Sequence, residues 1–170
     1  YCREERLGAQ GILRIFMHAC EAVAFAHQQL VIHCDLKPSN ILVNRDGRPI
    51  LLDFGIARLI ERVDSSTSDT RSSPGAMRAF TPRYASPEQR LHGLVTTTSD
   101  IYSLGVLLGE LLIQGQIKSA ELSAILAKAT HADAAQRYTS VDNFTDDISR
   151  YLAGLPVRAH PSTASYIATK

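Results

Sequence analysis

Two short segments of this 170-residue chain carry polar residues in an order that restricts its fold and chemistry more than any other feature. Residues 33–40 read HCDLKPSN, and residues 53–55 read DFG. The first segment contains a carboxylate (Asp35), a cation (Lys37) and an amide (Asn40), and the second begins with another carboxylate. Phosphoryl transfer needs such groups, because a hydroxyl must be oriented, phosphate charge stabilised and Mg²⁺ held by oxygen ligands. The two segments therefore predict this chemistry.

The chain between the two segments has the pattern of a β-hairpin. Residues 41–43 (ILV) and 50–52 (ILL) are short apolar runs typical of strands, and residues 44–47 (NRDG) contain Asp-Gly, a good hairpin signal. Because a hairpin returns the chain towards its starting point, it brings Asn40 and Asp53 near each other. Two ligands of one metal ion require this proximity.

These motifs resemble those of the protein kinases. The family's catalytic loop reads HRDxxxxN and its metal turn reads DFG, and both occur here in that order, with Cys34 in place of the arginine. Lys37, two residues after the aspartate, is similar to the lysine of the Ser/Thr branch. In the family the missing arginine pairs with an activation-loop phosphate. The resemblance therefore implies that loop phosphorylation does not act through that pair in this chain.

The resemblance continues further along the chain. Residues 86–88 (SPE) are similar to the family's APE motif, and residues 81–84 (TPRY) resemble the loop that receives the substrate hydroxyl. Asp100, within SDIYSLG, resembles the start of the family's central buried helix. Arg137 resembles the arginine that pairs with the glutamate of APE, which here is Glu88.

The match runs from about residue 7 to residue 152, and the sequences TPRYASPEQ and YLAGLPVR resemble eukaryotic-type kinases of bacteria. It implies a Ser/Thr protein kinase that transfers the γ-phosphate of ATP, with Mg²⁺, to a Ser or Thr hydroxyl of a protein substrate. Two alternatives stay open: a pseudokinase or interaction module that binds a partner without catalysis, and an inactive truncated remnant of a kinase.

The resemblance assigns roles to individual residues. Asp35 would orient the substrate hydroxyl, and Lys37 would stabilise the transferring phosphoryl group and contact ATP. Asn40 and Asp53 would hold Mg²⁺ and thereby the nucleotide. Thr81 would hydrogen-bond to Asp35 and Lys37 and so set the position of the substrate loop.

Simpler structural roles compete with some of these assignments. Asp35 in isolation could merely cap a turn, and Leu42, which the resemblance makes the floor under adenine, could be an ordinary core residue of a strand. We expect His33 to pack and hydrogen-bond beneath the loop, and Asp100 to accept backbone N–H bonds from it, because a buried carboxylate needs partners. The other histidines lack ligand spacing and have no predicted role: His18, His27, His92, His131 and His160.

Apolar periodicity predicts a mainly α-helical fold with a small β-hairpin region. The first helix has a stripe of apolar residues at spacings of three and four between Ile12 and Ala24. Further helices are expected at residues 100–113, 119–130 and 140–152, the first of them capped by Thr98 or Ser99. Residues 61–79, rich in Ser, Thr, Asp and Arg, have the composition of a loop.

The chain contains neither the Gly-rich sequence GxGxxGxV nor VAIK, which belong to the N-terminal lobe of the family. We therefore expect a protein-kinase-like C-terminal lobe over residues 1–153, with the N-terminal lobe absent, and a linker or tail at 154–170. The activation segment would be residues 53–88. The connection at 114–120 is shorter than in the family by about a helix.

Composition is consistent with one compact domain and narrows the partners. The chain is 45% hydrophobic and 21% charged, and its net charge of +1 gives no support to nucleic-acid binding. Three cysteines without CxxC spacing predict neither a disulfide framework nor a zinc site. No apolar run reaches membrane-spanning length. We expect a cytoplasmic location, either free or as the cytoplasmic part of a membrane-anchored protein.

Overall fold

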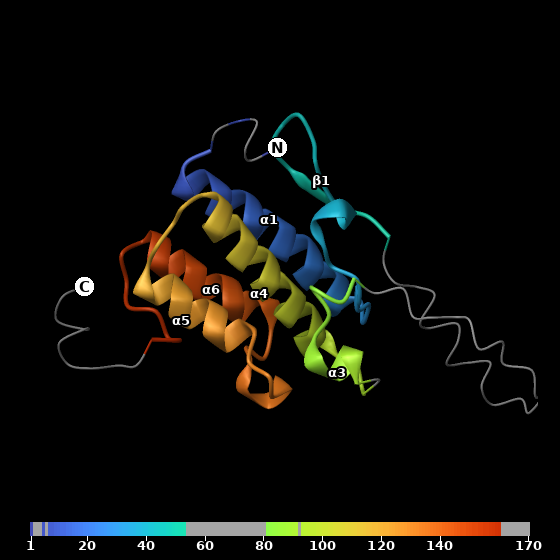
Figure 1. The fold of residues 1–170 in the computed structure, drawn as a ribbon. Helices are drawn as coiled ribbons and strands as arrows, with labels where there is room; N and C mark the ends of the chain where they lie inside the picture. The colour runs from blue at the N-terminus through green and yellow to red at the C-terminus, as the bar shows by residue number, and fades with distance from the viewer. Residues whose placement is uncertain (2–4, 6, 54–80, 92, 161–170) are drawn as a thin grey trace, which may run out of the picture.

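The computed structural model describes residues 1, 5, 7–53, 81–91 and 93–160. Its longer helices pack side by side (Figure 1) and are α1 (Ala9–Gln28), α4 (Thr97–Gln114), α5 (Ala120–Ala129) and α6 (Val141–Leu152). The shorter elements are η1 (Pro38–Asn40), β1 (Ile41–Val43), β2 (Pro49–Leu51), α3 (Pro87–Arg90) and η3 (Ala134–Gln136). The predicted fold class, mainly helical with a small hairpin, is confirmed. Among the described residues, no helix combines the length and apolar character needed to cross a bilayer.

Helix α1 forms because its apolar residues recur at helical spacing, as predicted. It extends beyond the predicted stripe, from Ala9 to Gln28, and its buried face includes Leu13, Phe16 and Val23. The helix ends before Leu30, whose φ of 61° lies in the left-handed region and directs the chain away from the helix axis. Burying this face against α4 and α6 supplies most of its stability, because propensity alone stabilises helices only weakly.

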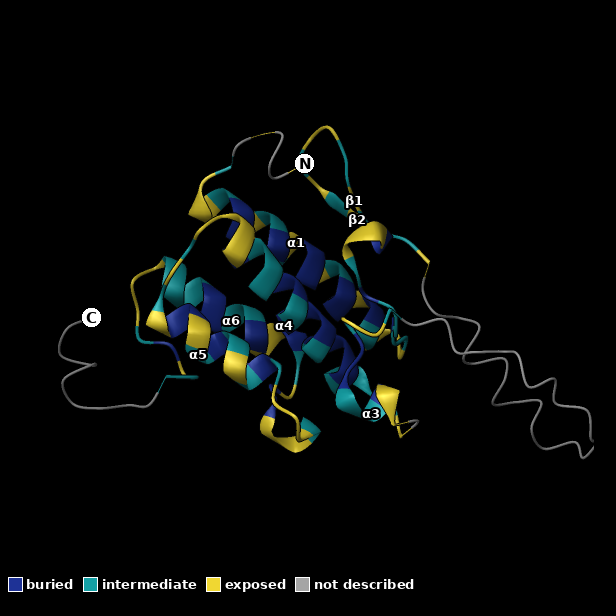
Figure 2. Ribbon diagram, viewed as in Figure 1, coloured by how far each residue is buried: buried dark blue, intermediate teal, exposed yellow. Residues whose placement is uncertain are grey.

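The core lies where α1, α4, α5 and α6 meet, and Figure 2 shows its buried residues along the facing sides of these helices. Phe144 of α6 is fully buried and meets the ring of Phe16 edge-on, with centroids 5.9 Å apart. Tyr138 approaches Phe144 from another side at 5.2 Å. Each such buried aromatic or aliphatic side chain contributes about 1.5–3 kcal/mol relative to exposure.

Helix α4 begins two residues earlier than the predicted caps allow. Thr96, not Thr98 or Ser99, is the N-cap residue, and its partner in the capping box is Ser99. The helix approaches α5 closely at Gly105, where a Cβ atom would lie 2.8 Å from Thr130 Cγ2. Only glycine permits this contact.

The α4–α5 connection is short, as the sequence indicates. Only the residues between Gln114 and Ala120 join the two helices. An open groove of about 1100 Å³ lies beside this connection and is lined by apolar residues such as Leu112, Leu122 and Leu126.

The predicted hairpin is confirmed, with its second strand one residue earlier than expected. Ile41 pairs with Leu51 and Leu42 with Ile50. In the turn, the Asn44 side chain accepts hydrogen bonds from the N–H groups of Asp46 and Arg48, and Gly47 has a φ of 76°. The Asn and Gly residues of the sequence therefore account for the turn, through the side-chain hydrogen bonds of Asn44 and the positive φ of Gly47.

Residues that follow α6 remain in contact with it. Val157 is buried, and the fully buried carboxylate of Asp147 accepts hydrogen bonds from the N–H groups of Arg158 and Ala159 and from the hydroxyl of Tyr138. This carboxylate therefore fixes the chain after α6. The division of the chain at residue 153 stays a prediction.

Candidate active site

The backbone of residues 33 and 34 is held by the carboxylate of Asp100, in the first turn of α4. Asp100 is fully buried, and it accepts hydrogen bonds from the N–H groups of His33 at 2.8 Å and Cys34 at 2.9 Å. Cys34 has a φ of 67°, which a non-glycine residue adopts only when its surroundings enforce it. The predicted structural role of Asp100 is confirmed.

Two histidines also form hydrogen bonds that hold this loop. His33 is fully buried, and its Nε2 lies 3.0 Å from the carbonyl oxygen of Leu52, so its predicted packing role is confirmed. His27 of α1, for which the sequence predicts no role, places its Nε2 2.8 Å from Asp100 Oδ2. It belongs to the set that orders the loop, and because it is distant in sequence no local pattern could have identified it.

The structure brings three of the predicted site residues together. Lys37 Nζ lies 2.7 Å from Asp35 Oδ2, and the Asn40 amide donates to the Asp35 carbonyl at 2.9 Å and to its carboxylate at 3.2 Å. The side chains of Asp35 and Lys37 remain 22% and 23% exposed. A carboxylate with one lysine and one amide beside it, still reachable from solvent, can orient a hydroxyl and meet a phosphate.

The hairpin also returns the chain from Asn40 to Asp53. The N–H of Leu52 donates to the carbonyl of Asn40 at 2.9 Å, which fixes the two ends of the hairpin against each other. Asp53 is exposed, with a φ of 49°. The sequence prediction that the hairpin returns Asp53 towards Asn40 agrees with this connection.

The donor atoms near the ends of the hairpin suit a hard cation that is bound together with another ligand. Asn40 uses its amide N–H₂ on Asp35, and its side-chain oxygen accepts only a long hydrogen bond from the Ser39 hydroxyl, at 3.5 Å, so a lone pair remains for an ion. Asp53 supplies a carboxylate. Within the described part of the chain, no three His, Cys, Asp or Glu residues gather as a metal cluster. Two oxygen donors fit Mg²⁺ only if waters and phosphate oxygens complete its octahedral shell.

The outer face of the hairpin is apolar and exposed. Leu42 is 54% exposed and its cross-strand partner Ile50 is 49% exposed. The alternative that Leu42 is an ordinary core residue of a strand is therefore wrong for the described residues. An exposed apolar surface beside the hairpin ends is compatible with a planar base resting on it.

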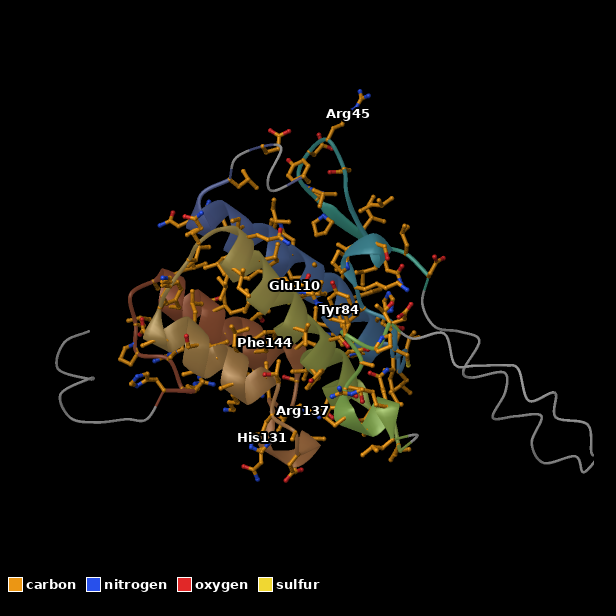
Figure 3. The ribbon with its side chains drawn as sticks, in the orientation of Figure 1. Arg45, Tyr84, Glu110, His131, Arg137 and Phe144 are labelled. Atoms are coloured by element: carbon orange, nitrogen blue, oxygen red, sulfur yellow. The ribbon has the colours of Figure 1, made fainter. Side chains whose placement is uncertain are left out.

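Hydrogen bonds and an ion pair connect the loop of residues 81–86 to α4. Tyr84 donates its hydroxyl to Glu110, at 2.9 and 3.0 Å from the two carboxylate oxygens (Figure 3). Burial and this hydrogen bond raise the pKa of Tyr84. Arg83 forms an ion pair with Glu110 at 2.6 Å, and the hydroxyl of Ser103 donates to the Tyr84 carbonyl at 2.8 Å. These contacts give the loop a defined position relative to the core.

Thr81, at the start of this loop, is partly buried and accepts the N–H of Tyr84 with its carbonyl oxygen. The residues that the structure describes include no hydrogen bond between its hydroxyl and Asp35 or Lys37. Its role stays a prediction. Phe54, Gly55 and most of the predicted activation segment lie outside the described residues.

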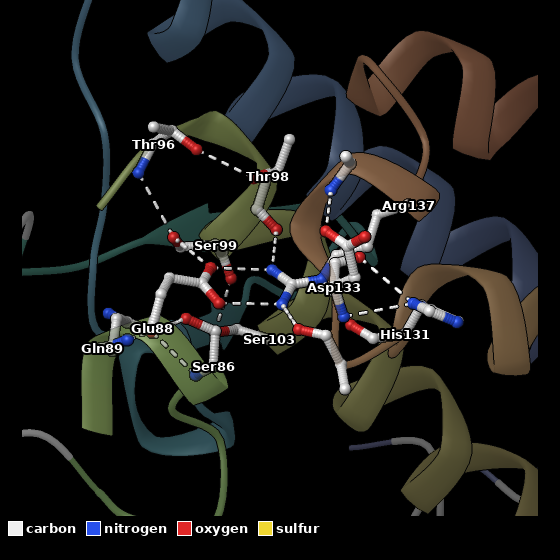
Figure 4. Close-up of polar contacts among 12 residues, drawn as sticks. Ser86, Glu88, Gln89, Thr96, Thr98, Ser99, Ser103, His131, Asp133 and Arg137 are labelled. Atoms are coloured by element: carbon white, nitrogen blue, oxygen red, sulfur yellow. Dashed lines mark hydrogen bonds and ion pairs between the residues drawn. The ribbon is translucent and has the colours of Figure 1, made fainter. Parts of the chain in front are cut away.

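The predicted pairing of Glu88 with Arg137 is confirmed. The guanidinium makes two parallel hydrogen bonds to the carboxylate, at 2.7 and 2.8 Å, and Ser99 donates its hydroxyl to the same carboxylate at 2.7 Å (Figure 4). Burial disfavours the ionised form of Glu88, but the hydrogen bonds from Arg137 and Ser99 outweigh it and lower the pKa to about 2.

The remaining N–H groups of Arg137 also have acceptors. They donate to the backbone carbonyl groups of His131, Thr98 and Ala132. The guanidinium lies over the ring of Tyr102, 5.0 Å from its centroid. One side chain therefore joins the segment after α5, the first turn of α4 and helix α3.

Comparison with known proteins agrees with this arrangement. Residues 2–155 match the model of the protein kinase domain. The serine/threonine-protein kinase PknD of Protochlamydia amoebophila is 30% identical over 182 residues, which cover 84% of this chain and 18% of the relative. PrkC of Bacillus subtilis, also a serine/threonine-protein kinase, is 32% identical over 163 residues, covering 80% of this chain and 24% of the relative.

The serine/threonine-protein kinase PknB of Mycolicibacterium smegmatis is 39% identical over 100 residues. These cover 59% of this chain and 15% of that relative. The chain thus spans about a quarter or less of the length of these relatives.

Proposed function

Since the chain belongs to the protein kinase family, we propose that it is the C-terminal lobe of a bacterial-type serine/threonine-protein kinase, with its catalytic loop at residues 33–40. The observation that carries the proposal is the cluster of Asp35, Lys37 and Asn40 on a loop held by Asp100. Membership of the family implies ATP and a divalent metal ion. We further propose that the metal is Mg²⁺ and that the acceptor is a Ser or Thr of a protein.

In this proposal Asp35 accepts a hydrogen bond from the substrate hydroxyl and orients its oxygen. Lys37, which contacts Asp35 at 2.7 Å, is close enough to stabilise negative charge that develops on the transferred group. The amide of Asn40 keeps the Asp35 carboxylate in one orientation. Positioning of this kind accounts for most of the catalysis in phosphoryl transfer.

Asn40 and Asp53 would hold Mg²⁺ through oxygen atoms, with phosphate oxygens and water as the other ligands. The ion, when bound, neutralises charge on the phosphate oxygens. Leu42 and Ile50 would lie beneath the base, because they form the exposed apolar face beside this site. Thr81 would support the substrate loop by hydrogen bonds to Asp35 and Lys37.

A second candidate is a pseudokinase or interaction module. Cys34 supports it, because this position lacks the arginine through which a loop phosphate could act. A cytoplasmic location, free or as part of a membrane-anchored protein, is proposed for either function.

The test compares the 170-residue chain with a longer protein in which an N-terminal lobe precedes it. We expect no labelled product from the chain alone, and transfer from ATP to a Ser/Thr substrate by the longer protein. Asp35→Asn should abolish transfer, whereas Asp142→Asn, at an exposed position of α6, should not. Inactivity of the longer protein with its fold intact would favour the pseudokinase, and steady transfer by the chain alone would contradict the two-lobe requirement.

A further inference from the structure

Gln89 of helix α3 is a buried amide that contacts the catalytic loop. It is 1% exposed, and its Nε2 donates to the carbonyl oxygen of Cys34 at 2.7 Å. Its Oε1 accepts from the N–H of Ser86 at 2.9 Å and from the Ser86 hydroxyl at 3.1 Å. The amide orientation is unambiguous, because the Ser86 N–H can only donate and the Cys34 carbonyl can only accept.

The hydrogen bonds between Gln89 and Ser86 are enough to begin helix α3, and the one to Cys34 is not needed for it. The exchange between Ser86 and Gln89 is a capping box, which satisfies N–H groups at the helix start. The bond from Nε2 to Cys34 plays no part in capping, because it joins residues 55 positions apart in sequence. The side chain therefore has a second partner that the local helix does not explain.

That second partner is a peptide in a strained conformation. Cys34 has a φ of 67°, and its N–H is held by Asp100 at 2.9 Å while its carbonyl is held by Gln89. The two contacts come from different helices and act on opposite sides of the residue that precedes Asp35. Because strained backbone persists only when its surroundings over-determine it, both contacts bear on the orientation of Asp35.

We propose that Gln89 is a positioning residue that couples the substrate loop, residues 81–86, to the backbone of Asp35. A shift of Ser86 would move Gln89 through its Oε1, and Gln89 would transmit the shift to the Cys34 peptide through its Nε2. The proposal rests on the kinase function for its consequence in catalysis. The coupling itself is a property of the folded chain and can be measured without activity.

Amide hydrogen exchange of the 170-residue chain tests the coupling. Gln89→Met removes the amide but keeps the side-chain length, and we expect exchange at residues 33–35 to become about fivefold faster, as for the loss of one buried hydrogen bond. The matched control is Tyr138→Phe, which removes a buried hydrogen bond to Asp147 away from this loop. Because Tyr138→Phe lowers the stability of the whole fold, it should speed exchange at residues 33–35 no more than it speeds exchange in the helical core, whereas Gln89→Met should act at residues 33–35 selectively.

Gln89→Glu keeps an acceptor for Ser86, removes the donor to Cys34 and places a carboxylate oxygen against the Cys34 carbonyl, so it should open this contact further than Gln89→Met. Faster exchange at residues 33–35 with unchanged exchange at residues 86–91 supports the coupling. The Gln89→Glu result alone tests the proposal if Gln89→Met does not fold. Unchanged exchange at residues 33–35 in Gln89→Glu overturns the proposal. In the unaltered chain, one side-chain amide proton of Gln89 should exchange slowly by nuclear magnetic resonance, and fast exchange of both protons would also overturn it.

The catalytic consequence is measured in the longer, active protein. Because a reacting group displaced by an ångström can cost on the order of a hundredfold, we expect Gln89→Met to lower kcat by roughly tenfold or more while KM for ATP changes little. A change in KM alone would contradict a positioning role. If the longer protein is inactive, the proposed function fails, while the exchange result still decides whether Gln89 couples the two loops.

Discussion

Two ion pairs of this chain differ in how far the cation is buried and in how many of its donors are in use. The side chain of Arg137 is fully buried while that of Glu88 is 19% exposed, and each nitrogen of the guanidinium donates to at least one oxygen. Lys37 and Asp35 form a pair at the same N–O distance, 2.7 Å, but about a fifth of each side chain is exposed.

The difference separates a structural role from a catalytic one. A guanidinium with all its donors in use cannot take a new ligand without losing an existing one, so the Arg137 pair holds three segments together. The Asp35 and Lys37 side chains can exchange their mutual contact for a hydroxyl or a phosphate at small cost, because water already reaches them. The burial of the cation and the use of all its donors therefore separate the structural pair from the one that can take a ligand.

The largest expected effect follows from removing one partner of the buried pair. Arg137→Ala removes the counter-charge of Glu88, which keeps only the hydrogen bond from Ser99, and one donor from each of three backbone carbonyl groups. We expect it to lower the free energy of unfolding by about 3–5 kcal/mol. Chemical denaturation measures this. Arg45→Ala in the hairpin turn, where the side chain points into solvent (Figure 3), is the control and should have almost no effect. Equal, small losses in both variants would contradict the comparison.

A second buried polar contact, between Tyr138 and Asp147, tests whether burial strengthens such contacts in this chain. Tyr138 donates to Asp147 at 2.8 Å, and burial together with this hydrogen bond raises the pKa of the tyrosine. Tyr138→Phe should lower the free energy of unfolding by roughly 1.5–3 kcal/mol, the range for a hydrogen bond to a charged group. Tyr102→Phe, at a partly buried residue of α4, is a suitable control. An unchanged melting temperature in Tyr138→Phe would mean that burial does not set the strength of such contacts here.

Acid should weaken the buried pair over a defined pH range. The pKa of Glu88 falls from 4.5 to about 2 on folding. A depressed pKa means that the ionised carboxylate stabilises the folded state above pH 4.5 and that this stability is lost as pH falls towards 2. Compared with the unaltered chain, Glu88→Gln should lose less stability between these pH values. Parallel curves for both proteins would contradict the assignment, and the solvent exposure of Glu88 limits the size of the difference.

The smallest effect is expected at the partly exposed pair of Lys37 and Asp35. Lys37→Ala should change the free energy of unfolding by less than about 1 kcal/mol, because water screens the pair and replaces its contacts. Lys118→Ala, in the connection after α4, serves as a control for loss of an exposed lysine. A loss in Lys37→Ala as large as in Arg137→Ala would show that the site is a structural ion pair.

Regular periodicity made much of the fold predictable. The apolar stripe from Ile12 to Ala24 predicted α1, and Asp-Gly between two apolar runs predicted the hairpin. The pairing of Glu88 with Arg137 followed from motif resemblance, because nothing local joins positions so far apart. These successes depend on signals that repeat within a few residues or on a family pattern.

Contacts of single side chains with distant backbone carry no such signal. His27 lies on a helix whose stripe predicts only burial, yet it contacts Asp100. Gln89 occupies the third position of a short helix, where capping alone would account for its residue type. The N-cap at Thr96 was missed because three threonines precede Ser99 and each could cap a helix. Such details are settled by tertiary packing.

The carboxylate of Asp100 has a consequence for the entropy of binding. By holding two consecutive N–H groups from within the first turn of α4, it freezes the backbone before Asp35 when the core folds. Fixing one residue of backbone costs about 1–2 kcal/mol in conformational entropy at room temperature. A substrate that meets this loop does not have to impose that order, so more of its interaction energy remains for alignment with Asp35.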